Sequence, residues 1–179
     1  MTGHTHPPRR GAHAPWADFR NSAAQGLPLG ISLAGEFDEP VSFALAGQAG
    51  LDAMAVECEF RAPDPEAFAA DLTSVRIGSI AVDTLATSEL YCERTDALVQ
   101  SVPWEVIHLT ITVAGRIRAE QDGRSGEFGR GSMALCRSDA PFRMEFGPDG
   151  DVARAHVIQA SIPFADLGSQ VSLISHLTA

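Results

Sequence analysis

The chain has 179 residues and a formal net charge of −10, from 23 acidic and 13 basic residues. All of its basic residues are arginines, and they do not cluster. The composition therefore argues against direct binding to nucleic acid, which depends on grouped cations. A hydrophobic content of 45% suits one domain with a substantial core, and no apolar run is long enough to span a membrane.

The first 71 residues predict an arm followed by a mixed segment. Residues 1–28 are rich in proline, glycine, histidine and alanine without periodicity, which is typical of a flexible arm. Within residues 29–71, the runs 31–37 and 41–47 suit short strands, and 51–60 suits either a helix or a strand. Residues 62–72 predict a short helix packed on a barrel, because Asp64 suits its N-cap and Pro65 its first turn.

Residues 72–167 alternate in the manner of β-strands. The run 74–87 bends at Gly78, and 88–95 forms a second run. Residues 106–113 alternate strictly, which predicts a strand, and Asp122-Gly123 predicts a tight hairpin after 116–121. Turns at 129–131, 139–141 and 148–150 separate further strands. This spacing predicts a mostly β fold, a jelly-roll (double-stranded β-helix) barrel, followed by a short C-terminal segment at 168–179.

The order of these turns resembles a known family. The stretches DLTSVRIGSIAV, VIHLTITVAGRIRAEQDGR, FGRGSMALCRSDAPFRMEF and ARAHVIQASIPFADL follow one another with short spacers. Over residues 68–167 they resemble the sensor domain of AraC-type transcription regulators, a cupin-like barrel. The resemblance implies that the barrel binds a small effector and forms a homodimer. It also implies that a separate helix-turn-helix domain binds DNA, and since no segment here matches that domain, we expect no direct nucleic-acid contact by this chain.

The metal ligands of cupin enzymes are missing at the corresponding positions. In those enzymes a His-x-His pair and a Glu precede a Gly, and a second motif adds another His. Here Gly115 fits the glycine, His108 stands at the Glu position, residues 100–104 lack the histidine pair, and Leu135 stands at the last His position. A divalent transition metal needs most of those ligands. We therefore expect no metal, no cofactor and no enzyme activity.

His108 raises a conflict about the direction of its strand. The apolar set Ile107, Leu109, Ile111 and Val113 predicts that their side points inward and His108 outward. The cupin register instead points His108 into the barrel, where it would contact an effector. The sequence leaves both interpretations open.

The other candidate residues also have two interpretations each. Trp104 follows Pro103 at a strand entrance and either closes over a ligand or packs in a core or dimer contact. Arg143 either pairs with a ligand carboxylate or forms a surface ion pair with Glu145 or Glu120. The predicted effector contacts are Trp104, His108, Thr110, Leu135 and Arg143.

Three functions fit these observations. The preferred one is a ligand-sensing and dimerisation domain, because the ordered turns are present and the metal ligands are not. The alternatives are a small cupin-type enzyme, such as an isomerase or dioxygenase, and a stand-alone module that pairs with a full-length regulator. The chain has three scattered cysteines, no CxxC pair and no secretory signal, so we expect a cytoplasmic protein without a membrane partner.

Overall fold

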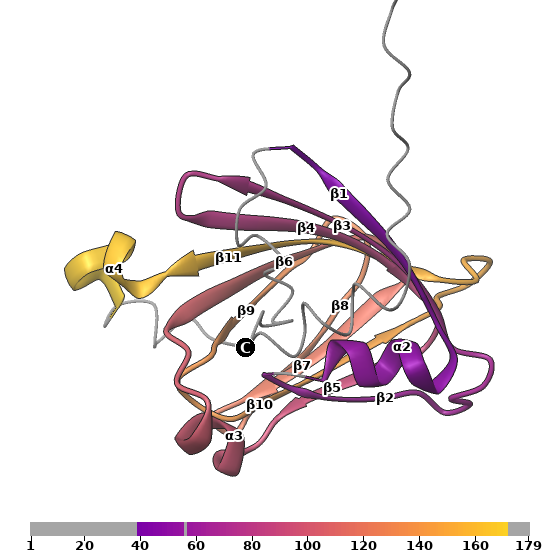
Figure 1. Ribbon diagram of the computed structural model, residues 1–179, viewed down its shortest axis with the longest axis horizontal. Helices are drawn as coiled ribbons and strands as arrows, with labels where there is room; N and C mark the ends of the chain where they lie inside the picture. Colours follow the sequence, from indigo (N-terminus) through magenta and orange to yellow (C-terminus); the bar gives the residue numbers. More distant parts are fainter. Residues whose placement is uncertain (1–38, 56, 172–179) are drawn as a thin grey trace, which may run out of the picture.

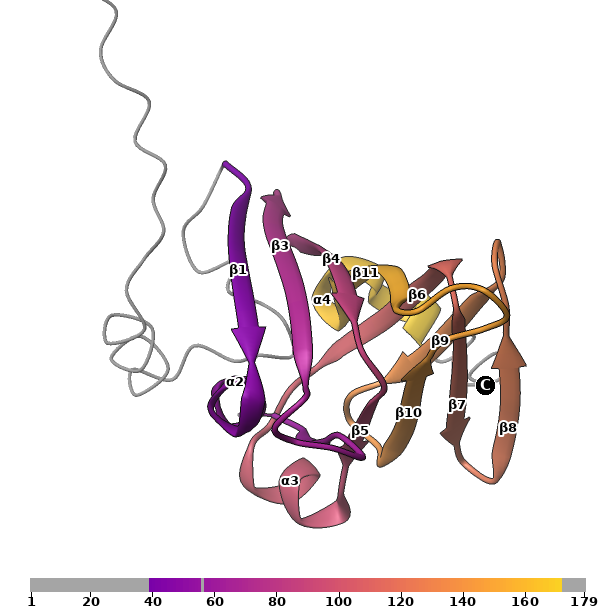
Figure 2. The same cartoon turned by 90° about the vertical axis from the view of Figure 1, so that its right-hand side faces the viewer.

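The structure is a computed structural model that describes residues 39–55 and 57–171. Two antiparallel sheets face one another and enclose the core (Figures 1 and 2). The six-stranded sheet has the order β1 (Val41–Ala46), β3 (Ala69–Ile77), β4 (Ile80–Thr87), β11 (Ala155–Pro163), β6 (Val106–Ala114) and β9 (Met133–Arg137). The five-stranded sheet has the order β2 (Glu59–Arg61), β5 (Leu90–Arg94), β10 (Phe142–Gly147), β7 (Arg116–Gln121) and β8 (Arg124–Phe128).

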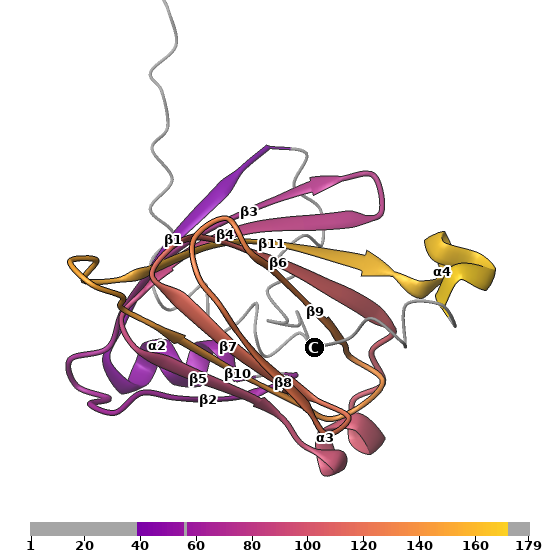
Figure 3. The same ribbon diagram turned by 180° about the vertical axis from the view of Figure 1, so that it is seen from behind.

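Short helices lie outside the two sheets. They are α2 (Gly47–Met54), α3 (Asp96–Ser101) and α4 (Phe164–Leu167), the last followed by a 3₁₀ turn at Gly168–Gln170. Within the described ranges, no helix is long and apolar enough to cross a membrane. Seen from behind in Figure 3, β7 and β8 lie in front of β10 and β5, at the end of the molecule opposite to β1. The predicted mostly β fold is confirmed, and it includes a short helix, although not at the predicted residues.

The predicted turns fix how the strands connect. Asp122 and Gly123 both have positive φ, 54° and 73°, as a two-residue hairpin between β7 and β8 requires. Gly78, at φ 64°, lies between β3 and β4. Gly115 lies between β6 and β7, where the chain passes from one sheet to the other. These positions confirm the glycine-based turn predictions.

The predicted helix at 62–72 is wrong. The Asp64 side chain accepts hydrogen bonds from the backbone N–H groups of Glu66 and Ala67, so the capping signal is real, but it closes only a turn. From Ala69 onward the residues alternate between buried and exposed as β3. The helix of this region is α2, which begins earlier at Gly47, and β1 confirms the strand suggested at 41–47. The suggested strand at 31–37 and the arm at 1–28 lie outside the described residues.

The six-stranded sheet turns its polar side chains inward. On β6, His108, Thr110 and Thr112 are buried, whereas Ile111 is 37% exposed on the opposite side. Neighbouring strands follow the same pattern, and their buried inward residues are Ser74, Asp83, Thr87, Gln159 and Ser161. The cupin register, not the apolar alternation, therefore gives the direction of β6.

The five-stranded sheet supplies large apolar side chains to the core. Its inward residues include Leu90, Cys92, Ile117, Phe142, Met144 and Phe146, all buried. Around the cavity, His108 and Gln159 of the six-stranded sheet therefore face Phe142, Met144 and Phe146 of the five-stranded sheet. This division between polar and apolar groups determines which kind of molecule the interior can hold.

Candidate ligand-binding site

A cavity lies between the two walls of the barrel. In this state its volume is about 20 Å³, which is room for about one water molecule. The lining residues come from both sheets and from the segments that precede β2 and β6. They are Cys58, Phe60, Leu85, Cys92, Trp104, His108, Phe142, Met144, Phe146 and Gln159.

His108 is held on the polar wall by its neighbours on β11. The register pairs His108 with Ser161 and Thr110 with Gln159. The Nδ1 atom of His108 lies 3.1 Å from the Ser161 hydroxyl and 3.1 Å from the Gln159 amide nitrogen. The Gln159 amide is oriented in turn by Thr110, whose hydroxyl donates to its oxygen over 3.1 Å. Because the amide N–H groups face Nδ1, that atom is the acceptor and the imidazole proton is on Nε2.

The Nε2 atom of His108 is buried and has no hydrogen-bond partner in the described part of the chain. Burial lowers the pKa of His108 to about 3, and the positive charge of Arg94 adds to the effect. The ring is therefore neutral near pH 7. It presents one N–H donor for which the surrounding residues provide no acceptor.

Aromatic rings enclose the His108 imidazole on two sides. The ring centroid of Trp104 lies 4.6 Å from that of His108, and the Phe142 centroid lies 5.8 Å away, both in edge-to-face geometry. The Arg94 guanidinium lies over the Trp104 ring at 5.6 Å. The imidazole is thus fixed by ring packing as well as by hydrogen bonds.

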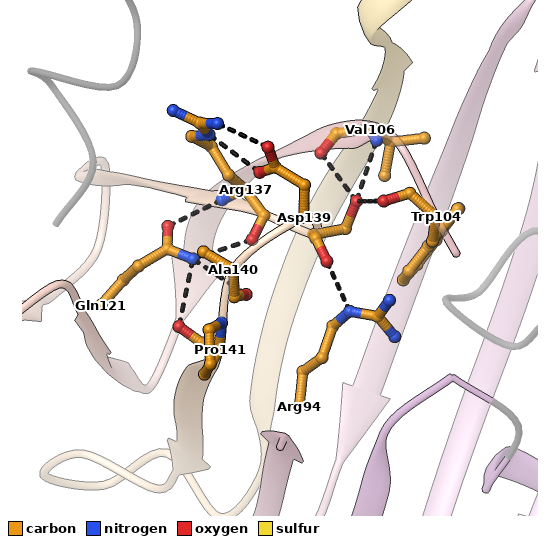
Figure 4. Close-up of polar contacts among 9 residues, drawn as sticks. Arg94, Trp104, Val106, Gln121, Arg137, Asp139, Ala140 and Pro141 are labelled. Carbon is orange, nitrogen blue, oxygen red and sulfur yellow. Dashed lines mark hydrogen bonds and ion pairs between the residues drawn. The ribbon is translucent and has the colours of Figure 1, made fainter. Parts of the chain in front are cut away.

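Arg94 is buried, and each of its guanidinium nitrogens donates to a backbone carbonyl. Figure 4 shows the bond from Nε. Nη1 donates to Glu57 and Nη2 to Val102, each over 2.7 Å, and Nε donates to Ser138. The Ser138 hydroxyl donates to the Trp104 carbonyl over 2.6 Å and accepts from the Val106 N–H over 2.9 Å. Together these bonds fix the chain where it enters β6.

The Gln121 side chain forms hydrogen bonds to the backbone on both sides of the β9–β10 corner. Its side-chain oxygen accepts from the Arg137 N–H and its nitrogen donates to the Arg137 carbonyl, both over 2.8 Å (Figure 4). The same nitrogen also lies 3.3 Å from the carbonyls of Ala140 and Pro141. The corner between β9 and β10 is therefore fixed beside Phe142, which lines the cavity.

A second group of buried polar atoms lies on the same wall. Asp83 is fully buried next to Gln159 in the β4–β11 register, with Ser74 opposite it on β3. Burial raises the pKa of Asp83 to about 7, and the Ser74 hydroxyl opposes this only in part, since the two side chains do not reach hydrogen-bonding geometry. The Thr87 hydroxyl is also buried without a partner in the described ranges.

The three cysteines are all free and buried. Cys58 and Cys92 line the cavity and lie close enough to interact, and this contact and burial raise the pKa of Cys92. Burial raises the pKa of Cys136 to about 12. Protonated thiols of this kind are small apolar groups rather than nucleophiles. Residues 39–55 and 57–171 contain no group of three or more side chains arranged to hold a metal ion.

The predicted contact residues separate into two groups. Trp104 and His108 line the cavity, and Thr110 is buried behind Gln159. Leu135 lies on the outward side of β9, and Arg143 lies on the outward side of β10, where it pairs with Glu93 at 2.9 Å rather than with Glu145 or Glu120. Leu135 and Arg143 therefore lie away from the polar wall of the cavity.

Sequence reasoning missed Arg94, Ser138, Gln159 and Ser161. The inward direction of Arg94 could have been predicted, because Leu90, Cys92 and Arg94 lie on one side of a strand, two residues apart. Gln159 and Ser161 likewise alternate with Ile158 and with Ala160 on β11. Their contact with His108 depends on the β6–β11 pairing, which no local pattern reveals.

A family model and a solved structure both relate this chain to AraC-like proteins. A model of the AraC-binding-like domain matches residues 51–158. The structure is similar to that of the AraC-like transcriptional activator CuxR, with a TM-score of 0.69 and 20% sequence identity, over 78% of this chain and 53% of that one. This chain thus spans about half the length of that activator. The curated proteins contain no match.

A weaker similarity extends to a cupin domain of an XRE family transcriptional regulator from Enterobacter cloacae. The TM-score is 0.39 and the sequence identity 12%, over 52% of this chain and 95% of that one.

Proposed function

The chain belongs to the AraC-binding-like domain family, and we propose that it is a sensor domain that binds a small effector inside its barrel. The observation that carries this proposal is the buried Nε2–H of His108, which has no acceptor in the described residues. A buried polar group without a partner costs about 1–3 kcal/mol. An effector that accepts this hydrogen bond would recover that free energy.

Binding fits the chemistry of the cavity better than catalysis. Among the described residues, His108 is the only histidine that lines it, and a pKa of about 3 makes it a poor general base or acid near neutral pH. The raised pKa of Cys92 keeps that thiol protonated. The lining can hold a molecule in place but offers no group suited to proton transfer or nucleophilic attack.

In a regulator, the effector would act by differential affinity. It would favour the barrel conformation in which the cavity is open enough to hold it. A separate DNA-binding domain would then change its affinity for DNA in response to that conformation. With a net charge of −10, this chain itself is not expected to contact DNA.

Thermal unfolding in the presence of a panel of small organic molecules tests the proposal. At least one molecule should raise the Tm of the wild type, and Cys92→Phe, which fills the cavity, should abolish that shift. Ser125→Phe is a matched control, because it adds the same ring at an exposed position on β8. An equal shift in wild type and Cys92→Phe, with both variants folded, would place the ligand elsewhere.

We also propose that the outward side of the six-stranded sheet, which we call the outer face, is the contact between two copies. The strand registers align its side chains into three cross-strand rows. These rows are Thr73–Thr84–Ile158–Ile111–Met133, Val75–Val82–Ala160–Leu109–Leu135, and a third made of the pair Ile77–Ile80 and the run Ile162–Ile107–Arg137, in which Ile107 is buried.

Charge favours a second copy as the occupant of the outer face. Arg137 is the only charged residue in the three rows, and it lies at their edge in an ion pair with Asp139. Two chains with net charge −10 repel each other, so they can pack most easily through a surface that carries few charges. Sedimentation of the wild-type chain at micromolar concentration should show a dimer, and a monomer would contradict the proposal.

A further inference from the structure

The cavity itself indicates the kind of molecule it takes. Its two walls differ, since His108 and Gln159 provide the polar groups and the opposite wall is built from Phe142, Met144 and Phe146. Phe60 and Trp104 add two further rings. A molecule that satisfies both walls has an apolar, ring-sized body and a polar group at one end.

Neither charge sign is accommodated by the lining. Among residues 39–55 and 57–171, those that line the cavity include no aspartate, glutamate, lysine or arginine. Arg94 lies behind Trp104 and does not line the cavity, and three of its five N–H groups donate to backbone carbonyls, so it makes no direct pair with a ligand carboxylate. A carboxylate buried here would gain only indirect attraction from Arg94 and would lack a hydrogen-bonded counter-charge, at a cost of several kcal/mol.

A cationic ligand is disfavoured by the same arginine. The guanidinium lies 5.6 Å from the Trp104 ring centroid, and its charge already disfavours protonation of His108. A second cation against those rings would meet the same repulsion. Asp83 lies behind Gln159 and does not line the cavity, and burial favours its neutral form.

The direction of the missing hydrogen bond is also fixed. Nδ1 of His108 accepts from its β11 neighbours, so Nε2 can only donate. Gln159 has its oxygen engaged by Thr110 and an amide proton directed at His108. The vacant position therefore calls for an acceptor on the ligand, such as a carbonyl oxygen.

We infer that the effector is an uncharged molecule with an apolar ring-sized body and an acceptor oxygen that binds the Nε2–H of His108. This inference rests on the proposed effector-binding function and narrows it to one chemical class. The cavity must widen to take such a molecule. Met144 is the lining side chain best able to move, because its unbranched thioether adopts many conformations.

A matched series on one phenyl ring tests the class. The chain has two tryptophans, so Trp16→Phe leaves Trp104 as the only indole fluorophore. This variant of the full chain is titrated with acetophenone, ethylbenzene, benzoate and benzylamine, while Trp104 emission is recorded. Acetophenone should bind about tenfold more tightly than ethylbenzene, which lacks the acceptor, and more tightly than either ion.

A second measurement identifies the hydrogen bond directly. The ¹⁵N and ¹H resonances of the His108 Nε2–H should shift with acetophenone and not with ethylbenzene. This readout uses the wild-type histidine, so it does not depend on whether a His108 variant folds. Binding of acetophenone without a change at Nε2–H would overturn the inference about the acceptor.

The outcomes separate this inference from the proposed function. If benzoate or benzylamine bound most tightly at Trp104, the effector site would stand and the uncharged class would be wrong. Equal binding of acetophenone and ethylbenzene would likewise leave the effector site standing, but it would contradict the inference that the ligand needs an acceptor oxygen. If none of the four changed Trp104 emission, both the class and the placement of an effector in this cavity would be contradicted.

Discussion

Arg94 shows how one buried side chain can organise a site without touching a ligand. Its three nitrogens bind carbonyls from three separate segments, at Glu57, Val102 and Ser138. Those segments carry or adjoin Cys58, Trp104 and β6. The arginine therefore sets the position of one end of the cavity, and its charge helps to keep the His108 imidazole neutral.

Replacement of this arginine should cost much of the stability of the domain. Arg94→Met leaves three carbonyls without their donor, and the free energy of unfolding should fall by about 3 kcal/mol or more. Arg118→Met is the matched control, because Arg118 is 56% exposed and its ion pairs are long, so a change within about 0.5 kcal/mol is expected. Urea unfolding of both variants measures the difference, and equal losses would contradict this role for Arg94.

Asp83 should make the stability of the domain depend on pH. Its folded pKa of about 7 lies above the ordinary aspartate pKa of 3.8, so the folded state retains a proton that the unfolded state loses between those pH values. Stability contributed by the neutral carboxyl is therefore present below about pH 4 and is lost as pH rises through about 7, by at most about 4 kcal/mol.

The comparison of wild type with Asp83→Asn isolates this effect from other carboxylates. The wild type should lose stability relative to Asp83→Asn as the pH is raised from about 4 to about 7. Urea unfolding at several pH values gives the difference between the two proteins. A difference that stays constant over that range would mean that Asp83 is not buried in the folded state.

Strand β6 shows what local patterns can and cannot predict. The strict alternation correctly predicted a strand at 106–113, since alternation marks two distinct sides. It could not tell which side faces inward, because the apolar set Leu109, Ile111 and Val113 lies on the outer face. The usual rule that apolar residues point inward assumes that nothing else covers the other side of the sheet.

The turns were the most predictable elements, because glycine and Asp-Gly pairs have few conformational alternatives. The helix at 62–72 was not, since Asp64 forms the same side-chain bonds in a single turn as at a helix start. Of the residues that line the cavity, Trp104 and His108 could be predicted from the sequence. The arrangement of Gln159 and Ser161 around His108 was not, because it depends on pairing between strands some fifty residues apart.

The connection between the two sheets at Gly115 should tolerate no side chain. Its φ is +74°, and an added Cβ would lie 2.6 Å from the Gly147 carbonyl oxygen and 2.9 Å from the Ala155 Cα. Gly115→Ala should therefore lower the free energy of unfolding by about 3 kcal/mol, from backbone strain and crowding together. Gly123 has nearly the same φ, +73°, with open space around it.

Gly123→Ala is accordingly the control, and it should cost only about 1 kcal/mol. Chemical denaturation of both variants separates crowding from the strain of a positive φ. Similar losses for the two would show that β6 and β7 are not held against β10 and β11 as described.

At the scale of the whole molecule, the barrel has an unusual distribution of polarity. The inner side of the six-stranded sheet carries hydrogen-bonding groups and the outer face carries isoleucine, valine and leucine. Ile77, Ile111 and Met133 of this face are exposed, and exposed apolar side chains grouped on one surface generally mark an interaction site. The six-stranded sheet thus directs polar side chains into the cavity, where they can bind a ligand, and apolar side chains to the outer face, which is proposed to join two copies.

A charge placed on the outer face should separate the copies. Ile111 lies within one of the three rows and is 37% exposed, so Ile111→Glu should keep the fold and shift sedimentation from dimer to monomer by like-charge repulsion across the two-fold contact. Ser125→Glu adds the same charge on β8, in the other sheet, and should leave the dimer intact. A dimer that persists in Ile111→Glu would locate the contact elsewhere.

The central claim is that His108 points into the barrel as a neutral imidazole with its proton on Nε2. Long-range ¹H–¹⁵N correlation spectra of the imidazole ring test it most directly, with His108→Phe identifying the signal. Between about pH 5 and pH 8 the account predicts a single unprotonated state, with a pyrrole-type Nε2 and a pyridine-type Nδ1. A His108 signal that titrates with a pKa near about 6.5 would show a solvated ring and would contradict the inward polar face and the site built on it.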